Sequence, residues 1–88
     1  MIYPKNKLFE KLASIEHERW ADWQKYLHSK LKYAEYKEND KTMACYVLDA
    51  YDYEHWSKQI DTPYESLTEK EKDSDRKQVM RYWDLINQ

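Results

Sequence analysis

Aromatic rings and guanidinium groups are the side chains of this 88-residue chain that are best suited to chemistry. A flat ring can stack on a planar base, and a guanidinium group can pair with a phosphate through two parallel hydrogen bonds. Both kinds of side chain occur on the same predicted helices. They predict a ligand-binding site formed by Arg19, Trp20, Trp23, Tyr64, Lys72, Asp75 and Arg76. A ring such as Trp20 or Tyr64 would stack on the base, while Arg19, Lys72 or Arg76 would pair with phosphate.

The same side chains also have a purely structural interpretation. Large rings usually fill the core of a small domain, which would use Trp20, Trp23, Tyr64 and Trp83 for packing. Charged side chains beside an apolar stripe are usually paired, so Arg19 would pair with Glu16, and Arg76 with Asp75. The 14 aromatic residues nevertheless outnumber the 13 leucines, isoleucines and valines. This surplus of rings keeps the binding hypothesis open.

The sequence offers little for catalysis. The segment His17-Glu18-Arg19-Trp20-Ala21 begins like a zinc-protease motif, but Ala21 stands where the second histidine ligand would be required. Cys45, in an apolar run, is typical of a small buried hydrophobic residue, and no general base is placed near it. We therefore expect no enzyme activity, no metal and no cofactor.

Composition excludes several other classes of function. The chain has no glycine, and the P-loop, the dinucleotide-binding turn and the nucleophile elbow all require it. A net charge of −2 argues against nucleic acid as a partner. No apolar run predicts a signal peptide or a membrane span, and the single cysteine suits a reducing compartment, so a cytoplasmic location is expected.

The pattern of apolar residues predicts a mainly α-helical single domain over residues 1–88, with three to four helices. Folding of a single domain of 88 residues would remove roughly two-thirds of the unfolded chain's surface from water. A long helix is expected from about Lys5 to Lys30, with Pro4 near its first turn. A short β-hairpin is expected next, with strands Leu31–Tyr36 and Met43–Leu48 and a polar turn over residues 37–41; the alternative for the first half of this segment is a helix. Without glycine the tightest turns are disfavoured, since Asn39 would have to be the left-handed residue.

Capping signals place the remaining helices. Asp49 is the expected N-cap of a helix that ends at Ile60. Thr62-Pro63-Tyr64-Glu65 and Thr68-Glu69-Lys70-Glu71 both match the capping-box pattern, which predicts a short helical turn and then a last helix from Glu69 to about Asn87. One half of the last helix's inner face is apolar, whereas the other half carries Lys72, Asp75 and Arg76. That charged half would be either a pocket wall or a salt-bridge network.

Two segments resemble a known family. Glu16-His17-Glu18-Arg19-Trp20-Ala21 is similar to the helical signature of the ryanodine-receptor repeat (RyR) domain, and residues 63–76, from Pro63 to Arg76, resemble that family's P-Y-x-x-L-x-E-x-E-K-x-x-D-R block. Trp20, Tyr64, Asp75 and Arg76 match the family pattern. The family's glycine-bearing segment after the first helix is replaced here by Ser29 to Asp40. The chain resembles the small stand-alone members from bacteria and phages more than the receptor repeats.

The resemblance implies a small helical domain with a minor hairpin and without enzyme activity. In the receptors these repeats are associated with adenine-nucleotide binding. Together with the surplus of rings, this predicts a module for a nucleotide-like ligand, adenine-containing or a cyclic nucleotide. In a phage such a module would serve anti-defence by sequestering an immune signal of the host. The alternative is a protein-interaction module whose exposed rings form hot spots on a host protein. Both hypotheses are compatible with a homo-oligomer.

Overall fold

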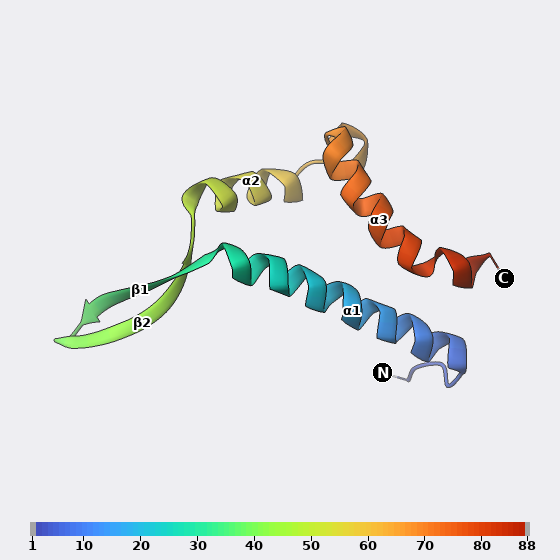
Figure 1. The fold of residues 1–88 in the computed structure, drawn as a ribbon, viewed down its shortest axis with the longest axis horizontal. Helices are drawn as coiled ribbons and strands as arrows, with labels where there is room; N and C mark the ends of the chain where they lie inside the picture. The colour runs from blue at the N-terminus through green and yellow to red at the C-terminus, as the bar shows by residue number, and fades with distance from the viewer. Residues whose placement is uncertain (1, 88) are drawn as a thin grey trace.

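The computed structural model of the chain describes residues 2–87 and is mainly helical, as the sequence predicts. The chain forms three α-helices and one two-stranded antiparallel hairpin, which lies between the first and second helices in the sequence (Figure 1). The elements are α1 (Lys7–Lys30), β1 (Leu31–Glu38), β2 (Lys41–Leu48), α2 (Ala50–Ile60), the 3₁₀ turn η1 (Tyr64–Ser66) and α3 (Glu69–Ile86). α1 runs in one direction, and α2 and α3 return along it, so that both ends of the chain lie at the same end of the molecule.

α1 begins two residues later than predicted. Asn6 is its N-cap, because the Asn6 side chain accepts a hydrogen bond from the backbone N–H of Phe9 at 2.7 Å. This bond satisfies one of the backbone donors that a helix start leaves without a partner. Pro4 therefore lies before the helix rather than in its first turn. The predicted end at Lys30 is confirmed, and the chain passes directly into β1.

The hairpin is confirmed, but its turn is tighter than predicted. The strands pair in register from Leu31 opposite Leu48 to Glu38 opposite Lys41. Only Asn39 and Asp40 lie between them, with φ values of 50° and 64°. Two residues at positive φ form the turn that best matches the twist of a hairpin, and asparagine and aspartate tolerate this region better than other residues with a Cβ atom. The expectation that the absence of glycine disfavours this turn was wrong.

Of the two predicted capping boxes, only the second forms. The Thr68 hydroxyl accepts from the N–H of Glu71 at 3.1 Å, and the Glu71 carboxylate accepts from the N–H of Thr68 at 3.0 Å. The first box was a wrong prediction. The Thr62 hydroxyl instead donates to the carbonyl of Lys58 at 2.6 Å, at the end of α2, and the short turn η1 has no side-chain cap.

The helices do not close over a core. Among residues 2–87 none is buried, and the tryptophans expected in the core are exposed, Trp20 by 56% and Trp23 by 44%. The accessible surface of 8074 Å² is about half of the roughly 16,000 Å² of an unfolded chain of 11.0 kDa, rather than the third that was predicted to remain. The molecule measures 60 × 34 × 23 Å. Its side chains therefore pack along seams between elements.

The main seam between helices joins α1 and α3. Arg81 on α3 donates to the Asp22 carboxylate on α1 at 2.7 Å, and the Tyr82 hydroxyl donates to the Glu16 carboxylate. These contacts hold the C-terminal half of α3 against the middle of α1. The N-terminal half of α3 and the whole of α2 then line an open space beside α1.

Candidate functional site

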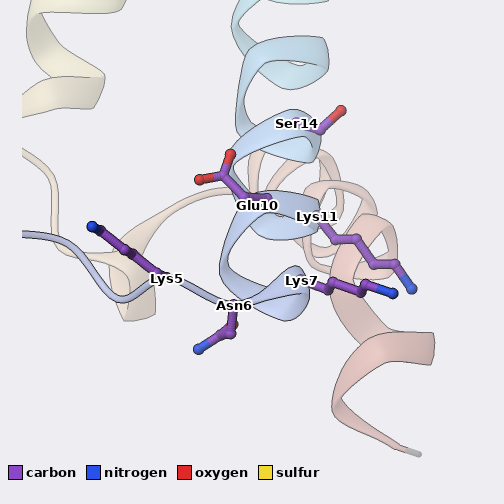
Figure 2. A pocket seen from close by; sticks show the side chains of 6 residues that line it. All are labelled: Lys5, Asn6, Lys7, Glu10, Lys11 and Ser14. Atoms are coloured by element: carbon purple, nitrogen blue, oxygen red, sulfur yellow. The ribbon is translucent and has the colours of Figure 1, made fainter.

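One surface hollow lies at the N-terminal end of α1, with a volume of about 620 Å³ (Figure 2). Its lining comes from a single stretch of chain, residues 5–14, and consists of Lys5, Asn6, Lys7, Glu10, Lys11 and Ser14. Lys7 and Lys11 extend to one side of the helix in Figure 2, away from Lys5 on the preceding segment. The lining includes no ring and none of the predicted site residues. This hollow is therefore not the candidate site.

A second hollow, the interhelical groove, lies between α1, α2 and the first half of α3 and has a volume of about 840 Å³. Its volume falls within the ~300–1,000 Å³ that is typical of small-molecule sites. α1 contributes the side chains between Arg19 and Lys30, and α2 those between Tyr51 and Gln59. The third wall begins at the N-cap Thr68 and includes Asp75. The capping box positions this wall, because it fixes where α3 begins.

Trp23, Tyr26 and Trp56 form an aromatic cluster in the groove, and Tyr51 also contributes to its lining. The centroids of the Trp23 and Trp56 rings lie 5.3 Å apart in an edge-on arrangement. Tyr26 lies 5.6 Å from the Trp23 ring and 6.2 Å from the Trp56 ring. Pairs at these distances are mutually stabilising, so the cluster is a firm platform rather than three independent side chains. The Lys30 ammonium lies 5.5 Å from the Tyr26 ring centroid and adds a cation beside the platform.

The groove carries charges of both signs. Its cations are Arg19, Lys30 and Lys70, and its carboxylates are Asp22, Asp52, Glu71 and Asp75. Several of these groups are already engaged. Arg81 lowers the pKa of Asp22 by hydrogen bonding, and the backbone N–H of Thr68 lowers the pKa of Glu71. Among the described residues, Lys70, Asp52 and Asp75 form no ion pair, so they are available to a ligand.

Arg19 lines the groove and is also paired, as the structural interpretation predicts. Its Nε and Nη2 atoms donate to the same Glu16 carboxylate oxygen at 3.2 and 2.6 Å. This pairing raises the pKa of Arg19 and lowers that of Glu16, whose carboxylate is also hydrogen-bonded by Tyr82. The Tyr82 hydroxyl, which shares the Glu16 carboxylate with Arg19, also raises the pKa of Arg19. Arg19 is therefore a partly engaged cation at the edge of the groove.

The structure brings together only three of the seven predicted site residues. Arg19, Trp23 and Asp75 line the interhelical groove. Trp20 does not: its ring stacks on the His17 ring with centroids 6.0 Å apart and is otherwise exposed. Residues one helical turn apart share a face only approximately, and the difference between Trp20 and Trp23 is enough to place one ring outside the groove.

Tyr64, Lys72 and Arg76 gather at a separate place, around Glu69. Arg76 donates to the Glu69 carboxylate at 3.1 Å, and the Lys72 ammonium lies 3.7 Å from it. Lys72 also lies 5.7 Å from the Tyr64 ring centroid. Arg76 lowers the pKa of Glu69, and Glu69 raises that of Arg76. The predicted pairing of Arg76 with Asp75 was wrong, and the charged half-face is a salt-bridge network at these two cations.

Sequence reasoning missed several groove residues, above all Tyr26, Lys30 and Trp56. The helical spacing of Trp23, Tyr26 and Lys30 was a usable signal, because residues three and four apart share a face. On the second helix, Tyr53, Trp56 and Ile60 share a face by the same spacing. Nothing local in the sequence indicates that Trp56 meets Trp23, because that contact depends on how the hairpin returns the chain.

Within residues 2–87, no three histidine, cysteine or carboxylate side chains gather as metal ligands would. No helix in the same range is long and apolar enough to cross a membrane.

Comparisons of this chain with protein-family models, with curated proteins and with solved structures find no match. The resemblance to the RyR domain therefore stays a prediction that depends on the quoted motifs. Of the four residues that carry it, Asp75 alone lines the groove, Trp20 is outside it, and Tyr64 and Arg76 belong to the Glu69 network.

Proposed function

We propose that the chain is a non-enzymatic binding module that holds a nucleotide-like ligand in the interhelical groove. The observation that carries this proposal is the platform of Trp23, Tyr26 and Trp56 beside cations and an unengaged carboxylate. A base would stack on the platform, since stacking of a base on an aromatic ring contributes about 1–3 kcal/mol. Adenine-containing nucleotides and cyclic nucleotides carry such a planar base.

The charges around the platform favour a ligand that carries both hydrogen-bond donors and a phosphate group. Asp75 can accept hydrogen bonds from a ribose hydroxyl or an exocyclic amino group. Lys30 and Lys70, with Arg19 at the edge of the groove, can contact phosphate oxygens. The carboxylates in the same groove disfavour a highly charged polyphosphate, so we expect a monophosphate or a cyclic phosphodiester to bind best. A phage protein of this kind would act by sequestering such a signal.

Isothermal titration calorimetry against adenosine, AMP, ATP, cyclic AMP and a set of cyclic dinucleotides tests the proposal. We expect binding of one or more of these compounds, weakened about 5- to 150-fold by Trp23→Leu, which removes the flat ring but keeps an apolar side chain. Trp20→Leu is the matched control, because Trp20 lies three residues away on the same helix but outside the groove. Its affinity should equal that of the unmodified protein.

Two results would contradict the proposal. One is the absence of binding to every compound by protein whose circular dichroism shows intact helices. The other is an equal loss of affinity in both tryptophan variants, since this would place the ligand outside the groove.

A second candidate function, binding to another protein, is favoured by a different observation. Trp20 is more than half exposed and contacts only the His17 ring among its aromatic neighbours, which is the exposure that a hot-spot residue has before binding. A pull-down with tagged protein should then recover one stoichiometric partner. Recovery should survive Arg76→Ala and be lost with Trp20→Ala. The opposite pattern would refute this candidate.

A further inference from the structure

The chain exposes more surface than a folded monomer of its mass. A monomeric protein of 11.0 kDa has an accessible surface of about 5,600 Å², whereas this chain has 8074 Å². The excess is therefore about 2,500 Å² per chain. Large apolar side chains are among the exposed residues, including Ile60, Met80 and Ile86 on the helices. An excess of accessible surface that includes many large apolar side chains is typical of a chain with an interaction surface.

The hairpin is the element with the least support from its own chain. It extends away from the three helices (Figure 1) and contacts them hardly at all. One of its faces carries Tyr33 opposite Tyr46, with ring centroids 5.9 Å apart, and the other carries Tyr36 opposite Met43. Tyr46 is 70% exposed. An isolated two-stranded hairpin is at best marginally stable in water, so these faces require another surface to pack against.

The helices have the complementary deficiency. Val79, Met80 and Trp83 on α3 are all exposed, whereas Arg81 and Tyr82 of the same helix contact α1. No described segment of the chain covers them, because the hairpin that could do so points away from the helices. Each chain thus has a hairpin that packs on no helix and a helical surface that no described segment packs on.

We infer that the chain is an obligate homodimer in which the hairpin of each copy packs on the helices of the other. A second copy supplies both missing parts in one reciprocal contact, as two-fold symmetry requires. Covering the excess surface of two chains would bury about 5,000 Å², which lies in the range of obligate homodimers, ~2,000–5,000 Å². A net charge of only −2 per chain leaves little repulsion between the copies.

The unmodified protein tests this inference without any variant. Light scattering after size-exclusion chromatography should give about 22 kDa, twice the 11.0 kDa of one chain. A mixture of unlabelled and ¹⁵N-labelled protein, unfolded and refolded together, should then be cross-linked at lysines. Cross-links from the hairpin residues Lys37 and Lys41 to helix lysines should join chains of different isotope. A mass of 11 kDa, or hairpin-to-helix cross-links confined to single chains, would overturn the inference.

Variants locate the contact. Tyr46→Ser should raise the dissociation constant of the dimer at least about tenfold, because it removes an exposed ring from the hairpin. Tyr3→Ser is the matched control: Tyr3 is also exposed, but it lies before α1 and stacks on Phe9 of the same chain. An unchanged dissociation constant for Tyr46→Ser, or an equal effect of Tyr3→Ser, would exclude the hairpin as the exchanged arm.

Dimerisation requires no nucleotide and no host protein. A mass of 22 kDa would therefore support the dimer even if the ligand screen found no binding. A mass of 11 kDa would overturn the dimer without affecting the calorimetric test of the interhelical groove.

Discussion

Carboxylates hold the helices together through hydrogen bonds that depend on their ionised form. Arg19 and then Tyr82 lower the pKa of Glu16, Arg81 lowers that of Asp22, and Arg76 lowers that of Glu69. The bonds from Tyr82 to Glu16 and from Arg81 to Asp22 connect α1 with α3. The ionised carboxylates of Glu16 and Asp22 are therefore part of the only extensive seam between helices in the described chain.

These lowered pKa values predict loss of stability in acid. A carboxyl whose pKa is lower in the folded protein stabilises the fold above its ordinary value, 4.5 for Glu16, and this contribution is lost as the pH falls through the lowered pKa. We expect the thermal midpoint, followed by circular dichroism, to fall progressively below pH 4.5. Glu16→Gln should reduce this dependence on pH.

Glu18→Gln is the control for the acid experiment, because Glu18 forms neither an ion pair nor a side-chain hydrogen bond with the described residues. The thermal midpoint of Glu18→Gln should depend on pH in the same way as that of the unmodified protein. Identical pH profiles for the unmodified protein and Glu16→Gln would show that the seam between α1 and α3 does not depend on this carboxylate.

At the scale of elements, helix starts are set by side chains next to them. Thr68 caps α3 through a reciprocal pair of hydrogen bonds with Glu71, whereas Thr62 bonds back to Lys58. Both threonines stand three residues before a glutamate, so the pattern alone does not distinguish them. The difference arises because the chain turns at Asp61 and Thr62, where the Thr62 hydroxyl reaches the last carbonyls of α2 first.

Thr68→Ala should therefore lower the free energy of unfolding by about 1 kcal/mol, since it removes a working N-cap. Thr62→Ala is the matched control and should have a smaller effect, because its hydroxyl satisfies a helix-end carbonyl that water can also reach. Urea unfolding followed by circular dichroism measures both. A larger effect at Thr62 would contradict the assignment of the cap.

The hairpin turn allows a stabilising substitution. Asp40 lies at φ 64°, a region where a Cβ atom is disfavoured and glycine is not. Asp40→Gly should raise the free energy of unfolding by about 0.5–1 kcal/mol, because Asn-Gly is the preferred pair for this turn. Asp40→Ala should be destabilising, since it keeps the Cβ atom and removes the polar side chain. Urea unfolding of the two variants in parallel would refute this account if alanine stabilised as much as glycine.

The whole molecule is open in a way that its separate elements do not indicate. Its radius of gyration is 18.5 Å, whereas a compact domain of this length has about 12 Å. Rings that would form a core instead form a platform in the groove, faces on the hairpin and isolated contacts elsewhere. A chain with so little internal burial should gain much of its stability from whatever covers these surfaces.

This openness predicts that stability depends on concentration. If two copies complete each other, the thermal midpoint should rise as the protein concentration increases, because unfolding is then coupled to dissociation. Scanning calorimetry over a hundredfold range of concentration measures this directly. A midpoint that does not change would indicate that a single chain is stable by itself, in contradiction to the proposed dimer.

The amino-acid sequence by itself determined the elements of this protein. Spacing and residue type reveal interactions between residues a few positions apart. These interactions determine the C-terminal ends of α1 and α2, the hairpin and the cap of α3. The two-residue turn at Asn39 and Asp40 and the start of α1 after Asn6 nevertheless differ from the sequence prediction.

Only the tertiary structure decided which of these side chains meet. The pairing of Arg81 with Asp22 joins residues 59 positions apart, and the Trp23–Trp56 contact forms because the hairpin returns the chain beside α1. No local pattern encodes such distances, since they depend on the accumulated direction of every element between the partners. For the same reason, the predicted site of seven residues divides into a groove, a salt-bridge network and one exposed tryptophan.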